Sequence, residues 1–538
     1  MKLKKIATIV LATCMFASVN GYVNADTTIP MNDVRKINAT FYGDTKTTKA
    51  FTWYTSQDYN NSDLEVVEKV DATPNFENPM KFKGKSSIPT NSQKEFVHKA
   101  EATGLKENTT YFYRVGDSEK NKWSDIGTFK TAPKEGKFTF IDIADTQAKS
   151  EEECILASQT ISKAFNTIGN AEFISLNGDL VDKGNIEEQW DWLFGHSQNN
   201  LLNTTFVPVA GNHESNEDSF IDHFNLNTPE GADVSTGAYY SYDYSNAHFI
   251  ILNNNENSDE YADFTPAQIE WMKTDVNVAR ENGAKWIVVK MHKGPYTTSN
   301  HATDDDIMGE NGVRTKVAPI MEELGIDLVL QGHDHIYSRT KALKNGEVTD
   351  ETKIVESFNG NEIEYTVKPD GTIYVTPNTA GPKVYYKNKK IDQSYYDLFE
   401  VAKEHPAGQY GSDPSDSSRP VRSQIQNFMG ITIDGEKLTA VTYEIDKSKS
   451  NGEPYIVDTF GISKKAETTE VLPDEDKQED KQEDVETEEE KNEVIESESK
   501  DAYTESPKTA DNNIIYTVVI MLSLSGIILV NFKLKREA

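Results

Sequence analysis

The chain contains 538 residues, of which 36% are hydrophobic and 27% are charged, and its formal net charge is −33. This acidity excludes nucleic acid as a binding partner, because a phosphate backbone needs clustered Lys and Arg, and no such cluster occurs between the two termini. The only cysteines are Cys14 and Cys154.

The first 25 residues predict an export signal. A basic start with Lys2, Lys4 and Lys5 is followed by an apolar run over residues 6–19 and by small or apolar residues up to Ala25, where a signal peptidase would cut. The less favoured alternative is lipoprotein processing at Cys14, which lies in a weak LATC motif. The exported chain would keep one cysteine, so we expect no intramolecular disulfide.

Residues 28–133 predict an all-β domain. Side chains alternate in the segments 51–55 and 111–115, and loops rich in Asn, Asp, Ser and Gly separate such segments. Leu105 and Tyr111 bracket a turn, with the tyrosine at the start of a strand. That arrangement is typical of the tyrosine corner of immunoglobulin-like sandwiches. We therefore expect an immunoglobulin/fibronectin III-like sandwich.

From residue 137 to residue 465 strands and helices alternate, which predicts an α/β domain with helices covering a largely parallel or mixed sheet. Helices are expected at residues 151–168 and around 186–195. The apolar run 326–330 predicts a buried strand that leads into the motif GHDH at 332–335. The late strands at 430–446 and 455–462 are expected to close a second sheet.

Polar residues of the kinds that bind metals follow five apolar strands, so we expect their side chains to meet at one edge of the sheet. They provide two carboxylates, one amide oxygen and three imidazoles, a mixed set suited to zinc, iron or manganese. Two ions about 3.5–4 Å apart that share one carboxylate would use all six, and such a pair serves phosphate ester hydrolysis. The six residues are Asp145, Asp179, Asn212, His292, His333 and His335. Each has a structural alternative, the strongest being Asn212 as a turn former.

These blocks resemble, in order, the signature motifs of the calcineurin-like metallophosphoesterases. The motifs are DTQ at 145–147, GDLVD at 178–182, GNHE at 211–214, His292, and GHDH at 332–335. The closer similarity is to the purple acid phosphatase branch. It implies a four-layer αββα catalytic domain, a dinuclear metal centre, and hydrolysis of phosphate monoesters through attack of a metal-bound hydroxide.

The resemblance also implies individual roles. Asp179 would bridge the two ions, Asp145 and His335 would hold the first, and Asn212, His292 and His333 would hold the second.

Two further histidines are predicted to be catalytic. His213 would contact phosphate or assist the leaving group, and His301 occupies the position of a phosphate-binding or proton-donating histidine. His301 shares its loop with Tyr296 and Asn300, which we expect to bind substrate.

The sequence departs from the purple branch at two positions. Asp182 stands where purple members carry the tyrosine whose phenolate on ferric iron gives the colour, which predicts a colourless protein whose first metal need not be Fe(III). Gln147 stands where other branches have a ligating histidine or a glycine. Each of these two side chains is either a metal ligand or a support of its loop.

Two alternative functions remain at this point. One is a phosphodiesterase or nucleotide hydrolase that uses the same metals. The other is an adhesin displayed on the cell wall, in which the sandwich binds a ligand and the phosphoesterase fold is inactive.

The C-terminal part predicts surface attachment. Residues 466–505 contain 18 acidic and 4 basic residues, which is typical of a disordered spacer. Residues 506–538 contain SPKTA, an apolar segment at 514–532 long enough to cross a bilayer, and a basic tail. This order resembles a sortase sorting signal of Gram-positive bacteria, although SPKTA lacks the usual leading Leu and final Gly. We expect an exported protein joined to cell-wall peptidoglycan, the alternative being a plain C-terminal membrane anchor.

Overall fold

The computed structural model describes residues 33–215, 218–404, 409–410 and 422–465. The predicted export signal, acidic spacer and sorting signal lie outside these residues. All described residues belong to one compact unit. Within the described ranges, no helix is both long and apolar enough to cross a membrane.

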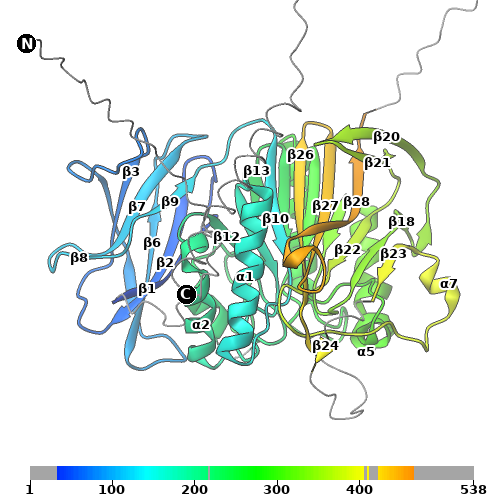
Figure 1. Cartoon of the computed structure of the whole chain (residues 1–538), viewed down its shortest axis with the longest axis horizontal. Helices are drawn as coiled ribbons and strands as arrows, with labels where there is room; N and C mark the ends of the chain where they lie inside the picture. The colour runs from blue at the N-terminus through cyan, green and yellow to red at the C-terminus, as the bar shows by residue number, and fades with distance from the viewer. Residues whose placement is uncertain (1–32, 216–217, 405–408, 411–421, 466–538) are drawn as a thin grey trace, which may run out of the picture. The chain divides into compact units, whose positions relative to one another are not determined.

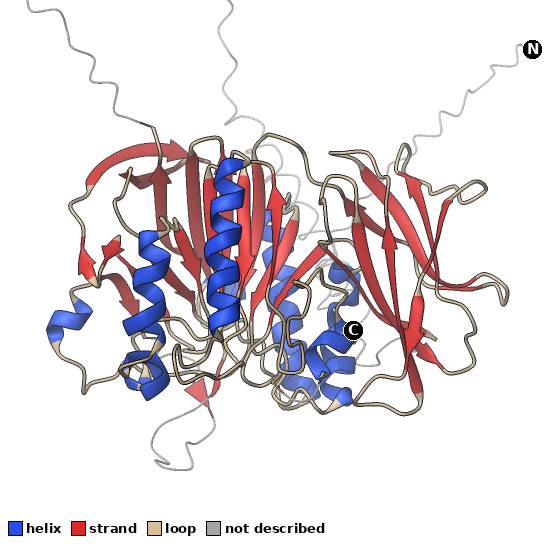
Figure 2. Cartoon of the chain, turned by 180° about the vertical axis from the view of Figure 1, so that it is seen from behind, coloured by secondary structure: helices blue, strands red, loops and turns tan. Residues whose placement is uncertain are grey.

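The N-terminal residues form two β-sheets packed face to face (Figures 1 and 2). One sheet contains, in spatial order, β4 (Met80–Lys83), β3 (Asp63–Glu68), β7 (Thr110–Asp117) and β8 (Lys122–Trp123), with β9 (Gly127–Lys130) also paired to β7. The strands of the other are β1 (Val34–Thr40), β2 (Lys49–Ser56), β6 (Glu95–Ala102) and β5 (Lys85–Ser87). The Tyr111 hydroxyl accepts a hydrogen bond from the Lys106 main-chain N–H at 2.8 Å, as a tyrosine corner requires.

The second sheet of this N-terminal domain continues into the α/β domain. Strand β1 pairs in parallel with β12 (Thr205–Val209), so that one sheet of twelve strands runs through both parts. Beside this junction the buried Lys49 ammonium donates to the Thr205 hydroxyl at 2.9 Å. One sheet of the N-terminal domain is therefore an extension of the large sheet of the α/β domain.

Two sheets form the centre of the α/β domain. The remaining strands of the large sheet are β20 (Thr352–Phe358), β21 (Asn361–Val367), β28 (Tyr455–Ser463), β27 (Lys437–Asp446), β26 (Ile425–Asp434), β10 (Phe138–Ile143) and β11 (Phe173–Asn177), which lies next to β12. The seven-stranded sheet has the order β13 (Tyr240–Tyr244), β14 (Ala247–Ile251), β15 (Trp286–Lys290), β16 (Leu328–Leu330), β22 (Ile373–Pro377), β17 (Tyr337–Thr340) and β23 (Phe399–Lys403). Two small hairpins pair β18 (Leu343–Lys344) with β19 (Glu347–Val348), and β24 (Gln409–Tyr410) with β25 (Arg422–Ser423).

Helices cover the outer faces of the two sheets, which gives helix, sheet, sheet and helix layers (Figures 1 and 2). The helices are α1 (Glu151–Ile168), α2 (Glu187–Leu201), α3 (Ser219–His223), α4 (Pro266–Glu281), α5 (Asp305–Met308), α6 (Ala318–Glu323) and α7 (Gln393–Tyr396), with single turns η1 (Asn300–Thr303), η2 (Val313–Val317) and η3 (Ser450–Gly452). The packing of strand β15 explains why its first four residues are apolar. Trp286 and Val288 pack between the sheets, while Ile287 and Val289 pack under α4 and α6.

The predicted helix at residues 151–168 is confirmed as α1. Ser150 caps its start by accepting from the Glu153 N–H, and Gly169 ends it with a φ of 71° and an N–H bonded to the Phe165 carbonyl. Helix α2 begins where expected but runs past Gly195 to Leu201. The buried Leu201 side chain contributes packing that outweighs the low helix propensity of glycine.

Two predictions about the sheets are wrong. The strand ends that carry the metal-binding types of residue belong to both sheets, since β10, β11 and β12 lie in one and β15 and β16 in the other. The late strands β26–β28 join the first sheet through β26, which pairs antiparallel with β10. Apolar alternation identifies a strand but does not identify its partner, which explains both errors.

His248 of β14 gives a pH-dependent prediction. Burial lowers its pKa, but hydrogen bonds to the Asp243 and Asp275 carboxylates at 2.7 and 2.8 Å outweigh burial and raise the pKa to about 9. An unfolded histidine titrates near 6.5. The stabilisation by charged His248 is therefore complete below pH 6.5 and is lost as the pH rises through 9.

We expect the difference in unfolding free energy between the wild type and His248→Gln to fall by about 2 kcal/mol from pH 6 to pH 10, allowing for solvent screening at the exposed Asp243. Urea unfolding at the two pH values measures it. A difference that does not change with pH would contradict the ion pairs.

Candidate metal centre

The carboxyl ends of five strands bring the predicted ligands together. Three follow the neighbouring parallel strands β10, β11 and β12, and three follow β15 and β16 of the other sheet. In that order they are Asp145, Asp179, Asn212, His292, His333 and His335. The carboxyl ends of the strands are where α/β proteins usually place their ligand-binding and active sites.

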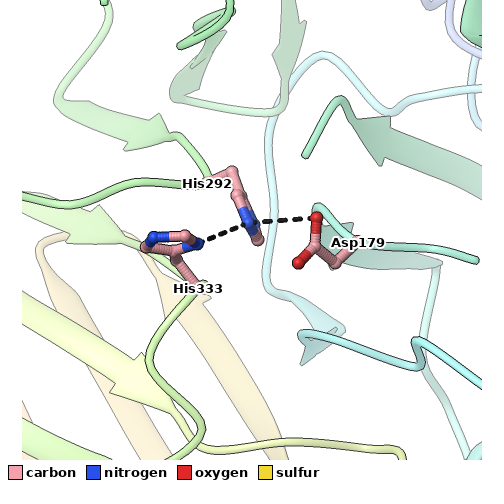
Figure 3. Close-up of side chains that lie close together, drawn as sticks. All are labelled: Asp179, His292 and His333. Carbon is pink, nitrogen blue, oxygen red and sulfur yellow. Dashed lines mark hydrogen bonds and ion pairs between the residues drawn. The ribbon is translucent and has the colours of Figure 1, made fainter. Parts of the chain in front are cut away.

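His292 lies at the centre of one group of donors (Figure 3). Its Nε2 is 3.2 Å from Asp179 Oδ1, 3.1 Å from Asn212 Oδ1 and 3.2 Å from His333 Nδ1. A second group contains Asp145, Asp179 and His335, with Asp145 Oδ1 3.3 Å from His335 Nε2. Asp179 belongs to both groups, which is the position of a bridging carboxylate.

Main-chain carbonyls fix the orientation of two imidazoles. His292 Nδ1 donates to the Asn177 carbonyl at 2.9 Å, and His335 Nδ1 donates to the Lys383 carbonyl at 3.0 Å. Because a carbonyl can only accept, both rings carry a proton on Nδ1, which leaves Nε2 as the atom that faces the other donors and could bind a metal. Such outer hydrogen bonds are the usual support of metal-binding histidines.

The backbone around the site is strained and crowded. Asp145, Asp179 and His333 have φ angles of 56°, 50° and 71°, in the left-handed region that non-glycine residues rarely adopt. A side chain at Gly178 would place its Cβ 2.3 Å from His292 Nδ1, and one at Gly332 would place it 2.4 Å from the Asn177 carbonyl oxygen. These glycines let the two sheet ends approach closely enough for their ligands to meet.

Charges of opposite sign face each other in this buried cluster. Burial raises the pKa of Asp179, but the imidazoles of His292 and His213 outweigh burial and hold that pKa far below its usual value. Burial lowers the pKa of His292, but Asp179 and Asp145 overcome it and raise the pKa to about 9. Burial lowers the pKa of His333 and His335.

The donor atoms fit metal cations. Asp145 Oδ2, His335 Nε2 and Gln147 Oε1 are buried and have no hydrogen-bond partner among the described residues. Leaving three such lone pairs without a partner costs free energy, and cations would satisfy them. The set consists of oxygen and imidazole nitrogen without thiolate, which suits zinc, iron or manganese.

The two predicted catalytic histidines flank the cluster from different sides. His213 places Nε2 3.7 Å from Asp179 Oδ2 and its Nδ1 2.5 Å from the Asp182 carbonyl oxygen. Asp182 thus contacts the site through its main chain. The His301 ring lies 3.9 Å from the His333 ring, between centroids, and its Nδ1 is 2.6 Å from Asp304 Oδ2.

The structure does not support Tyr296 as a substrate-binding residue. Its ring is 2% exposed and packs in the core on Tyr374 with Arg314 over its face. An aromatic residue near a motif can pack in the core or line the site. The burial of Tyr296 places it in the core. Asn300, also predicted to bind substrate, is exposed at the start of η1.

Several supporting residues were not predicted. Glu214 is buried and accepts main-chain N–H groups from Val181 and Gly211, which ties the GDLVD and GNHE loops together. Burial and the nearby Asp179 raise its pKa to about 8. Lys290, inside the apolar strand β15, forms a fully buried ion pair with Asp142 of β10 at 2.6 Å. A lysine in an otherwise apolar strand was the available signal.

Comparison with known proteins identifies the two parts of the chain. Residues 138–337 match the family model of the calcineurin-like phosphoesterases, and residues 34–131 match the N-terminal domain of purple acid phosphatases. Residues 138–337 are thus similar to calcineurin-like phosphoesterases, and residues 34–131 are similar to the N-terminal domain of purple acid phosphatases. These matches support a metal-dependent phosphoesterase.

Individual relatives are similar over part of their length. Purple acid phosphatase 18 of Arabidopsis thaliana is 27% identical over 46% of this chain and 54% of the relative. Purple acid phosphatase 21 of the same plant is 25% identical over 53% of this chain and 64% of the relative. The chain thus covers between half and two thirds of these two relatives. A purple acid phosphatase from yellow lupin (Lupinus luteus) seeds shares the fold, with a TM-score of 0.60 at 15% identity over 80% of this chain and 75% of that one.

Proposed function

We propose that this protein is a dinuclear-metal phosphatase that hydrolyses small phosphate monoesters. The observation that carries the proposal is the shared position of Asp179 in two groups of donors, each with at least one imidazole. Asp145 and His335 would complete the first site, and Asn212, His292 and His333 the second. When bound, the cations would acidify a water molecule and neutralise charge on the phosphoryl oxygens.

The protein's own side chains divide the remaining work between His301 and His213. His301 Nδ1 is held by the Asp304 carboxylate, so its Nε2 is the atom able to pass a proton to the leaving alcohol. Both nitrogens of His213 are engaged, one by the Asp182 carbonyl and the other by the Gln147 amide. We therefore assign proton donation to His301, and to His213 a positioning role beside Asp179.

This assignment predicts a dependence on the leaving group. In His301→Ala, kcat/KM should fall by about 10²- to 10⁴-fold for an alkyl phosphate, whose alkoxide needs a proton, and much less for 4-nitrophenyl phosphate. In His213→Ala the two substrates should lose activity equally. Steady-state kinetics with both substrates measures this, and an equal loss in His301→Ala would refute the role of His301 as proton donor.

The substrate class is tested with a monoester and a diester of the same phenol. We expect the monoester to be hydrolysed faster, and we expect chelation of metal to stop the reaction. Preference for the diester would favour the phosphodiesterase alternative. Inactivity of the metal-loaded protein on both would favour the adhesin displayed on the cell wall.

We further propose that the protein is exported and held at the cell surface. Support comes from the sequence of residues 1–25, which predicts a signal peptide, and of residues 506–538, which resembles a sortase sorting signal. A covalent link to peptidoglycan predicts release from cell walls by a muralytic enzyme and retention after detergent extraction. Release by detergent alone would indicate the membrane-anchored alternative. The N-terminal domain would be a fibronectin III-like support, in accord with its tyrosine corner.

A further inference from the structure

Gln147 is a buried polar residue of the DTQ motif at 145–147. Its side-chain amide has two polar atoms, Nε2 and Oε1, which need different hydrogen-bond or ligand partners. The residue is 0% exposed, and its main-chain N–H donates to the Asp179 carbonyl at 3.0 Å. Its side-chain Nε2 lies 2.5 Å from His213 Nε2, whereas Oε1 has no hydrogen-bond partner in the part of the chain that the structure describes. A buried amide oxygen left in that state is unfavourable, because it has lost its hydrogen bonds to water without gaining others.

The hydrogen bonds of His213 determine which way this amide faces. The Asp182 carbonyl oxygen, 2.5 Å from His213 Nδ1, can only accept, so Nδ1 carries the ring proton of the neutral imidazole. His213 Nε2 then has a lone pair and must face a donor, which is the Gln147 NH₂ group. The two polar atoms of an amide point in different directions, so Oε1 is turned away from His213.

Two other unpartnered buried atoms point to the ion with which Oε1 would associate. Asp145 Oδ2 and His335 Nε2 both come from the group of Asp145, Asp179 and His335. Gln147 lies two residues from Asp145 and is tied to the main chain of Asp179. An amide oxygen is a suitable ligand for zinc, manganese or iron alongside carboxylate and imidazole.

We propose that Gln147 is a ligand of the first ion through Oε1 and at the same time holds His213 through Nε2. The inference rests on the proposed dinuclear site and adds a donor to it. Gln147 would thereby connect the first ion to a histidine beside the bridging carboxylate.

Titration of the metal-free protein with Mn²⁺ by calorimetry tests the proposal without an activity assay. Gln147→Leu, similar in size but without donor atoms, should weaken one of the two Mn²⁺ sites by about 10- to 100-fold and leave the other unchanged. Gln147→Glu keeps an oxygen and should retain the affinity. His213→Ala removes the partner of Nε2 but not the ligand, and should also retain it.

The outcomes separate this proposal from the proposed function. If the wild type binds two Mn²⁺ ions and Gln147→Leu binds them with wild-type affinities, Gln147 is not a ligand although the dinuclear site stands. If the wild type binds no Mn²⁺, the dinuclear site itself fails. Thermal unfolding of each metal-free variant shows whether it folds. If Gln147→Leu does not fold, Gln147→Glu becomes the test. Weaker Mn²⁺ binding by a folded Gln147→Glu would then overturn the proposal.

Discussion

Replacing Asp179 with Asn should reduce kcat/KM for a phosphate monoester by on the order of 10³-fold or more and should lower the metal content of the purified protein. Asp179 is the one carboxylate shared by both groups of donors, and its neighbour His292 lies 3.2 Å away. The amide of asparagine has nearly the same shape but carries no charge, so it cannot balance two cations.

Steady-state kinetics and elemental analysis measure the two effects of Asp179→Asn together. Asp233→Asn, the same change at an exposed loop position, is the matched control and should retain activity and metal. An Asp179→Asn protein with wild-type metal content and activity within a few-fold of the wild type would show that Asp179 bridges nothing.

Replacing Lys290 with Met should destabilise the fold by about 3–5 kcal/mol, because the change leaves a buried carboxylate without its counter-charge. Lys290 and Asp142 are both 0% exposed and join the two sheets directly below the metal centre. Burial lowers the pKa of Lys290 and raises that of Asp142, so each depends on the other to remain charged. Asp142 also accepts from the side-chain amide of Asn177, and the main-chain carbonyl of Asn177 orients His292.

Urea unfolding of Lys290→Met against a double variant with Asp142→Asn separates the buried charge from lost packing. The double variant carries no isolated charge and should regain most of the stability. If both variants were equally unstable, lost packing would account for the destabilisation. If Lys290→Met lowered the unfolding free energy by less than about 1 kcal/mol, the ion pair would not be stabilising the contact between the sheets.

The sequence identified the side chains that meet at the candidate metal centre but not the way the sheets present them. Asp179 and His292 were predictable because each follows an apolar strand, and such strand ends are exposed to the same side of a sheet. The division of the strands between two sheets was not predictable, since pairing partners such as β10 and β26 are separated by nearly three hundred residues. Strand periodicity contains no information about that separation.

Supporting contacts were harder to predict than ligands. The carbonyls of Asn177 and Lys383 orient two histidines, and every residue has a carbonyl, so no side-chain pattern marks them. Tyr296 shows the opposite problem: its position near the motif suggested the site, but its ring fits a gap in the core. Proximity in sequence predicts which loop a residue occupies, not the direction of its side chain.

The most direct test of a metal centre built between two sheet ends is the number of metal ions that the purified wild-type protein retains per chain after free metal is removed. Two donor groups that share Asp179 predict two ions per chain. A folded protein that retained no ion, or only one when metal was supplied in excess, would contradict the dinuclear centre and the phosphatase function built on it.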